Sequence, residues 1–135
     1  MQNISAQGIN EKEKVMNFKH GSLESIILNA MWELEKAGLY KNSVKDVYEF
    51  LSKTDSTKRA YTTIKTVMDR LFEKEVLLRI KQGKKFFYRT AYSKSDIIIT
   101  SLRKIATQYC NGDMSKLMHI TKSMCESETP VAMVK

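Results

Sequence analysis

The chain has 135 residues, of which 23 are Lys or Arg and 15 are Asp or Glu, giving a formal net charge of +8. This length allows one hydrophobic core with a small appendage, and no apolar run approaches the ~20 residues of a membrane-spanning helix. Two cysteines, Cys110 and Cys125, are too few for a disulfide framework. We therefore expect reduced thiols and a cytoplasmic location, and the basic composition favours an anionic polymer as partner.

The first two helices are predicted after a polar segment, residues 1–18, which we expect to be a flexible N-terminal arm. Ser22 is the expected N-cap of a first helix that ends near Gly38. Ser43 is expected to cap a second helix, and a polar connector, residues 52–58, follows it. The apolar residues that recur at helical spacing in these two helices are Leu23, Ile27, Ala30, Met31, Leu34, Val44, Val47, Tyr48 and Leu51.

A third helix over residues 60–74 carries the most informative pattern. Its apolar residues follow the spacing of a buried helical stripe, and they are Ile64, Val67, Met68 and Leu71. The opposite surface holds short hydroxyls, flexible cations and few carboxylates, namely Tyr61, Thr62, Thr63, Lys65, Thr66, Asp69 and Arg70. A merely solvated face more often alternates Glu with Lys, so this composition favours close approach to a DNA groove.

Two runs rich in aliphatic and aromatic residues, 76–81 and 85–90, come next, and Gly83 lies between them. They predict a β-hairpin, whose tip carries Lys81, Lys84 and Lys85. Between Thr57 and Arg89 there are ten Lys or Arg and three Asp or Glu, a net charge of +7. Three helices and a basic hairpin predict a winged helix-turn-helix domain over residues 19–92 that binds DNA.

Two more helices are expected over residues 93–110 and 113–125, within a helical region that spans residues 93–128. Ser93 and Asp96 resemble a capping box at the start of the fourth helix, and Asp113 is the expected cap of the fifth. Both helices carry more apolar surface than isolated exposed helices, so we expect them to form a homodimer interface. The predicted dimerisation residues are Ile98, Leu102, Ile105, Tyr109, Met114, Leu117 and Met118. Residues 129–135 are read as a tail.

Other kinds of site were weighed against these interpretations. Cys110, Met114, Met118, His119, Met124 and Cys125 are soft ligands within sixteen residues and could suit Cu(I). Helical spacing favours an interface stripe instead, so we predict no metal and no cofactor. Trp32 fits a packing anchor better than a ligand-stacking residue. No nucleophile, base and orienting group recur together, so an enzyme is not predicted.

Five ordered motifs resemble the penicillinase-repressor family, which includes the methicillin-resistance and copper-responsive repressors. They are Glu24-x-x-Ile27-Leu28-x-x-Met31-Trp32, Ser43-Val44-Lys45-Asp46-Val47-x-x-x-Leu51, Ala60-Tyr61-Thr62-Thr63-Ile64-x-Thr66-x-x-x-Arg70-Leu71-x-x-Lys74, Gly83-Lys84-x-Phe86-x-Tyr88 and Ser93-x-Ser95-Asp96. The resemblance implies a homodimeric repressor that binds an inverted-repeat operator. It also implies that Tyr61, Thr62, Thr63, Lys65 and Thr66 face the major groove, with Arg70 and the hairpin lysines near phosphates.

The sequence as a whole predicts a mainly α protein with a small β-hairpin, built as a winged helix-turn-helix domain plus C-terminal dimerisation helices. Its partners would be a double-stranded DNA operator and a second copy of the chain. Two alternatives remain: a winged-helix module for protein–protein interaction, and a thiol- or metal-responsive regulator. Family members induced by β-lactams are cut by a sensor protease at an Asn-Phe bond, where Arg103-Lys104 stands here. The inducing factor is therefore open.

Overall fold

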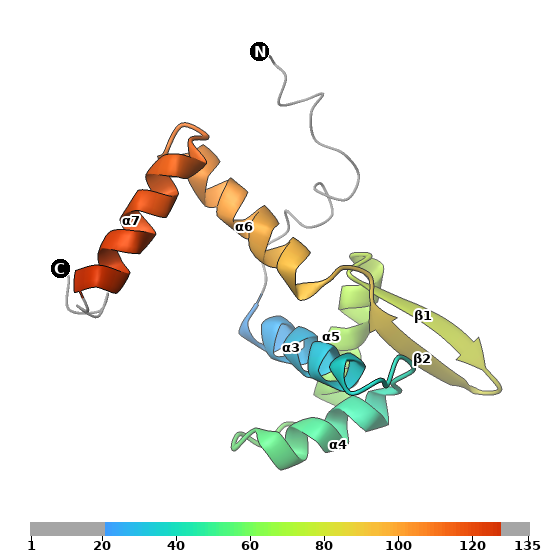
Figure 1. Cartoon of the computed structure of the whole chain (residues 1–135). Coiled ribbons are helices and arrows are strands. Elements are labelled where there is room, and N and C mark those ends of the chain that lie inside the picture. Colours follow the sequence, from blue (N-terminus) through green and yellow to red (C-terminus); the bar gives the residue numbers. More distant parts are fainter. Residues whose placement is uncertain (1–20, 128–135) are drawn as a thin grey trace. The chain divides into compact units, whose positions relative to one another are not determined.

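The structure is a computed structural model that describes residues 21–127, so the predicted arm (residues 1–18) and tail (residues 129–135) lie outside the described residues. The described elements are α3 (Ser22–Lys36), α4 (Val44–Thr54), α5 (Tyr61–Glu73), β1 (Leu77–Gln82), β2 (Lys85–Thr90), α6 (Lys94–Tyr109) and α7 (Met114–Ser127), as Figure 1 shows. This confirms the mainly α fold with a hairpin. The chain divides into two compact units between Ile97 and Ile98. None of the helices within residues 21–127 is long and apolar enough to cross a membrane.

The first helices of the N-terminal unit, called the head below, begin and end at residues with clear capping roles. Gly21, not the predicted Ser22, is the N-cap of α3, because its N–H donates to the Glu24 carboxylate over 2.8 Å. Ser43 caps α4 as predicted: its hydroxyl accepts from the Asp46 N–H at 3.1 Å, and its own N–H donates to the Asp46 carboxylate at 2.9 Å. This reciprocal pair is a capping box.

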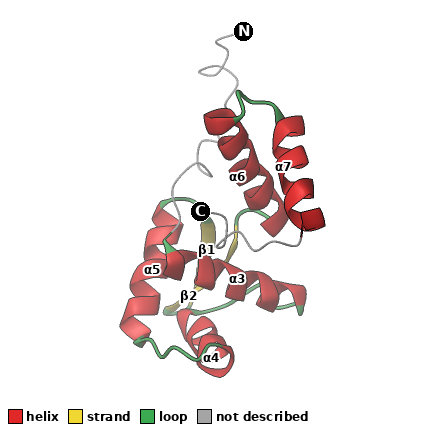
Figure 2. Ribbon diagram, turned by 90° about the vertical axis from the view of Figure 1, so that its left-hand side faces the viewer, coloured by secondary structure: helices red, strands yellow, loops and turns green. Residues whose placement is uncertain are grey.

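The core of the head lies where α3, α4 and α5 pack together and where α3 and α5 meet the hairpin (Figure 2). The predicted α5 stripe is buried throughout, and helical residues supply most of the other core positions. Buried hydrophobic residues of the core are Ile27, Leu28, Ala30, Met31, Leu34, Val44, Val47, Leu51, Ile64, Val67, Met68, Leu71, Val76, Leu77 and Tyr88. Burying the α5 stripe leaves the other face of that helix outward.

The hairpin, called the wing below, is an antiparallel pair in which Leu77 lies opposite Thr90 and Gln82 opposite Lys85. Gly83 takes φ +65° in the turn, a conformation that favours glycine. A bridge between Asn42 and Tyr88 attaches the wing to the segment before α4. The base of the wing is therefore part of the core, while its tip extends from it (Figure 1).

The helices α6 and α7 begin at the predicted caps. The Ser93 hydroxyl accepts from the Asp96 N–H at 3.0 Å, and the Asp113 carboxylate accepts from the Ser115 N–H at 2.9 Å. Between them, Asn111 and Gly112 take positive φ values of 53° and 80°, which reverses the chain direction without a long loop.

Candidate nucleic-acid interface

The outer face of α5 carries the residues that the sequence predicted to contact DNA. Tyr61 is 43% exposed, and the structure also exposes the other predicted contacts of this helix, which are Thr62, Thr63, Lys65, Thr66 and Arg70. The Thr66 hydroxyl donates to the Thr62 carbonyl at 2.9 Å, which leaves its oxygen able to accept. The helix thus presents small polar groups on a rigid element.

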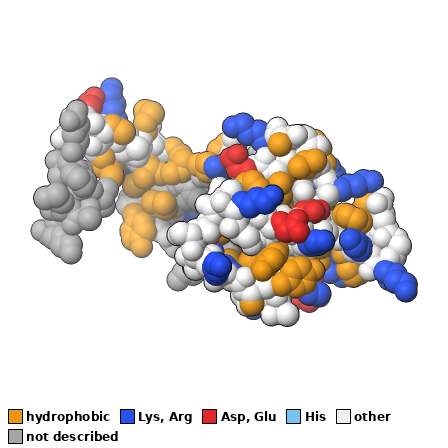
Figure 3. Space-filling view, turned by 90° about the horizontal axis from the view of Figure 1, so that it is seen from below, with side chains coloured by type: hydrophobic (Ala, Val, Ile, Leu, Met, Phe, Trp, Pro, Cys, Tyr) orange, Lys and Arg blue, Asp and Glu red, His pale blue; other side chains and the backbone are white. Residues whose placement is uncertain are grey.

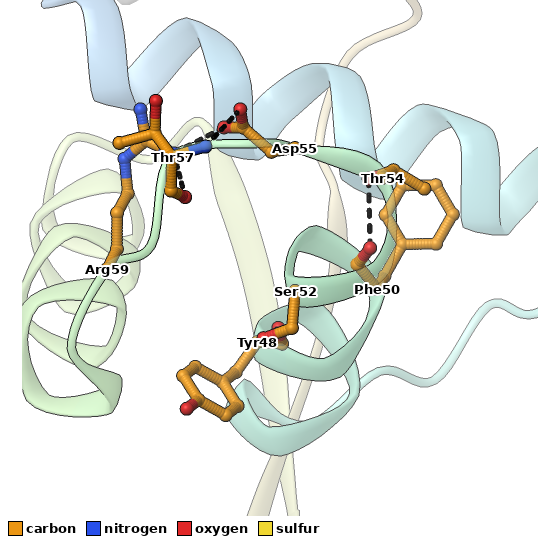
Figure 4. A network of polar contacts seen from close by, with 7 residues as sticks. All are labelled: Tyr48, Phe50, Ser52, Thr54, Asp55, Thr57 and Arg59. Carbon is orange, nitrogen blue, oxygen red and sulfur yellow. Dashed lines mark hydrogen bonds and ion pairs between the residues drawn. The ribbon is translucent and has the colours of Figure 1, made fainter.

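The connector between α4 and α5 fixes how α5 begins. The Asp55 carboxylate accepts hydrogen bonds from the Thr57 N–H, at 3.2 Å, and from the Arg59 guanidinium, with which it also forms an ion pair (Figure 4). The Thr57 N–H and Arg59 lower the pKa of Asp55, so the carboxylate stays charged at neutral pH. This compact turn fixes the connector, and α5 is held in place by its packing against α3 and α4 as well.

The first turn of α5 leaves its N-terminal end open to an anionic partner, because no side chain caps it. Its N-cap is Ala60, whose side chain cannot accept a hydrogen bond from the helix. The positive end of a helix dipole therefore lies at an exposed terminus. The Tyr61 ring packs edge-on against Tyr48 of α4, with ring centroids 5.6 Å apart, so the two helices of the helix-turn-helix hold this terminus together.

Asp69, on the same face of α5, is the centre of a polar network that the sequence did not reveal. Its carboxylate accepts from the Lys65 ammonium at 3.0 Å and from the Tyr88 hydroxyl at 3.0 Å, and Arg79 lies 3.4 Å away. Burial raises the pKa of Asp69, but the hydrogen bonds from Lys65 and Tyr88 outweigh that effect, and the pKa lies below its ordinary value. The carboxylate is thus ionised and neutralised by neighbouring cations.

Arg79 joins α5 to the wing through its flat guanidinium group. The guanidinium carbon lies 3.9 Å from the centroid of the Phe72 ring, on α5, and 4.0 Å from that of the Phe86 ring, on β2. Stacking on both rings holds Arg79 by cation–π attraction as well as by the contact with Asp69. Strand alternation could have placed Arg79 opposite Tyr88 and beside Phe86, but only the folded chain brings Asp69 and Phe72 there.

The predicted wing cations lie at the surface. Lys81, Lys84 and Lys85 are exposed, and the Lys81 ammonium lies 5.8 Å from the Phe86 ring centroid. Figure 3 shows basic side chains spread over the drawn face of the head, including its hairpin end at the right. The cations of α5 and of the wing therefore belong to one folded unit, as contacts with a continuous phosphate backbone require.

The predicted dimerisation residues are exposed or half-buried in the single chain. Exposed fractions range from 36% at Leu102 to 81% at Tyr109. The others of the exposed set are Ile98, Ile105, Met114 and Met118, and Leu117 is half-buried. Cys110 is buried and Cys125 is exposed. Within residues 21–127, no group of three or more His, Cys, Asp or Glu side chains is arranged to hold a metal ion.

Trp32 serves as the packing anchor that the sequence predicted. Its ring packs against the core, and its indole N–H donates to the Tyr92 carbonyl at 3.1 Å, just after the wing. Glu35 reinforces this junction, because its carboxylate accepts from the N–H and the hydroxyl of Thr90, at 2.7 and 2.6 Å.

A helix-turn-helix with an exposed hydroxyl- and lysine-bearing helix, followed by a basic two-stranded wing, defines a winged-helix transcription regulator. The comparison with known families agrees: the family model described as penicillinase repressor matches residues 20–129. The chain belongs to the penicillinase repressor family, and it is a transcriptional repressor of the winged-helix type. A search of curated proteins finds no match.

Proposed function

We propose that the protein is a cytoplasmic homodimeric repressor that binds an inverted-repeat operator in a sequence-specific manner. The observation that carries this proposal is the outer face of α5, which combines exposed Thr62, Lys65 and Thr66 with an uncapped N-terminus. Membership of a repressor family supports it.

In the proposed complex, α5 enters the major groove and the wing lies along the adjacent backbone. Threonine hydroxyls donate to or accept from base edges, and their methyl groups contact thymine methyls. Arg70, Lys81, Lys84 and Lys85 contact phosphates, which position the helix but carry little sequence information. The concentration of +7 between Thr57 and Arg89 supports this division of roles.

The homodimer in this proposal forms through the exposed apolar stripes of α6 and α7. Large exposed apolar surface on a single chain is unfavourable in water, and a second copy removes it symmetrically. Two α5 helices would then reach major grooves one DNA turn apart, about 34 Å. Occupied promoter DNA excludes polymerase, and separating the dimer would restore transcription.

A competition experiment tests specificity. Duplexes selected from a random library by the protein serve as labelled probes, and a scrambled duplex of the same composition serves as the competitor control. Specific binding predicts an inverted repeat among the selected sequences and at least 1,000-fold preference for it, at the lower end of the usual range of about 10³–10⁷. Equal competition by both duplexes would reject the repressor and favour a winged-helix module that meets acidic protein surfaces.

A second experiment separates the helix from the wing. Thr66→Val keeps the shape of the side chain but removes the hydroxyl, and we expect it, like Lys65→Ala, to reduce preference for the selected duplex. Lys84→Ala should weaken binding to all duplexes alike. It should also lower the salt slope, which is the steepness with which the logarithm of the binding constant falls as the logarithm of the salt concentration rises, by about 1. If Thr66→Val and Lys65→Ala weaken all duplexes equally, the assignment of α5 as the reading element is wrong.

A further inference from the structure

We propose that Asp69, Phe72, Arg79, Phe86 and Tyr88, called the wing clamp below, position the wing relative to α5 and so determine whether its lysines reach the DNA backbone. The proposal rests on the DNA-binding function proposed above. None of the five is assigned a DNA contact. They are positioning residues, which act through Lys81, Lys84 and Lys85.

The wing needs such a device because a two-stranded hairpin is only marginally stable in water. Its base is secured: Leu77 and Tyr88 are buried, and Thr90 binds Glu35. Its outer half is exposed from Ile80 to Phe86. Without further contacts, the outer half could twist and bend about that base.

The clamp lies at the level where the buried half of the wing ends. Arg79 pairs with Tyr88 across the strands, and Phe86 pairs with Lys81, two positions nearer the tip. The two side chains that reach from the wing to Asp69 are Arg79 and Tyr88, and the Arg79 guanidinium stacks between Phe72 and Phe86. The contacts therefore join α5 to both strands, from the middle of the wing outward to Phe86.

The charges of the clamp explain why a carboxylate is tolerated on the DNA-facing helix. An isolated Asp69 would repel phosphates, but Lys65 and Arg79 both form ion pairs with it. The three groups together keep a net charge of +1. Asp69 itself is about one-third exposed, with 34% of its side chain accessible. The Asp69 carboxylate is thus matched by ion pairs within the protein, and it orients Lys65 on α5 and Arg79 on β1.

The clamp makes the wing a rigid extension of α5, so the distance between the two is set before DNA arrives. Ordering the wing on binding would otherwise cost free energy that the phosphate contacts must offset. We expect the wing lysines to contribute fully to affinity only when the clamp is intact. Phosphate contacts made by a loose wing would also position α5 less well on the bases.

The first test measures the wing position without DNA. Cys110 and Cys125, the two cysteines of the chain, are replaced with Ser, and spin labels are attached at Thr62→Cys on α5 and Gln82→Cys at the wing tip. Pulsed electron resonance on labelled protein diluted with unlabelled protein then reports the distribution of label distances. We expect a narrow distribution in this parent and a clearly broader one after Arg79→Gln.

Two further variants make this measurement decisive. Asp69→Asn removes the central charge without changing the size of the side chain, and it should broaden the distribution as Arg79→Gln does. Arg89→Gln removes an exposed arginine from the same hairpin, and this variant should leave the distribution of label distances narrow. Unfolding curves show whether each variant is folded. Equally narrow distributions in the parent, Arg79→Gln and Asp69→Asn would overturn the proposal, whether or not the protein binds DNA.

The second test links the clamp to binding, with the selected duplex as the probe. In the wild-type protein Lys84→Ala should lower the salt slope by about 1, and in the Arg79→Gln background the same change should lower it by less than half as much. In the Arg89→Gln background the full effect should return. Equal effects in all three backgrounds contradict the clamp, while failure of the wild-type protein to select any duplex contradicts only the proposed function.

Discussion

Replacing Lys74 with methionine should destabilise the head by breaking an ion pair that joins the end of α5 to the start of α3. The Lys74 ammonium lies 3.0 Å from the Glu24 carboxylate, and the side chains are 34% and 6% exposed. Methionine keeps most of the aliphatic stem of lysine. The variant therefore tests the charge and the hydrogen bond rather than the packing.

The magnitude follows from the burial of Glu24. A hydrogen bond to a charged group contributes about 1.5–3 kcal/mol, and the partial exposure of Lys74 places the expected loss near the lower half of this range, at about 2 kcal/mol. Glu24 still accepts from the Gly21 N–H at 2.8 Å, so it is not left without any partner. For a unit of this size, the loss corresponds to a decrease in Tm of roughly 10 °C.

The pH dependence has a definite sign. Burial raises the pKa of Glu24, but the Gly21 N–H and Lys74 lower it more, so its pKa in the folded state lies below the ordinary value. A lowered carboxyl pKa stabilises the fold at neutral pH, and this contribution disappears as the pH falls below about 5 and through the folded pKa. The difference between wild type and Lys74→Met should therefore shrink in acid.

Urea unfolding followed by Trp32 fluorescence measures this effect, because Trp32 is the single tryptophan of the chain and packs against the core. Lys45→Met is the matched control: Lys45 is 66% exposed on its side chain and lies 3.9 Å from Glu49, and its loss should cost less than about 0.5 kcal/mol. Equal losses for Lys74→Met and Lys45→Met at pH 7 would refute the reasoning. If Lys74→Met lowers the free energy of unfolding as much at pH 3 as at pH 7, the proposed role of the Glu24 charge is refuted.

Three other outcomes are expected. Ser43→Ala removes the α4 cap and should lower the free energy of unfolding by about 1 kcal/mol in the same urea assay; no loss would mean that the cap is replaced by water. Leu71→Ala opens a cavity at a fully buried site and should cost about 2–5 kcal/mol, whereas a loss below 1 kcal/mol would contradict the packing described. Ile105→Asp should convert the dimer to a monomer in light scattering without changing head stability. Thr107→Asp, the same charge elsewhere on α6, should not, and a monomeric wild-type protein would contradict the proposed dimer.

Several elements could be predicted from local sequence because their causes are local. Ser43 and Asp46 are three residues apart and form the α4 capping box among themselves. The α5 stripe from Ile64 to Leu71 has helical spacing, so its burial and the exposure of Thr62, Lys65 and Thr66 follow from one periodicity. The wing was similarly visible, because Gly83 separates two β-prone runs.

The start of α3 shows where local reasoning ends. Ser22 has the hydroxyl of a good N-cap, yet the cap is Gly21. The deciding group is Glu24, whose carboxylate binds both the Gly21 N–H and Lys74, fifty residues further along the chain. The contact between Gly21 and Glu24 is local, but no pattern around Ser22 contains Lys74, which holds the Glu24 carboxylate from the other side.

The chain on its own determined which segments become helices or strands and which face of each is apolar, because periodicity and capping act over a few residues. Only the tertiary structure determined that Asp69 and Phe72 of α5 meet Arg79 and Phe86 of the wing. In the sequence Arg79 is one cation among many, and Asp69 is an ordinary partner for Lys65 one helical turn away. Their joint role depends on how the hairpin folds back over α5, which is set by packing between residues distant in sequence.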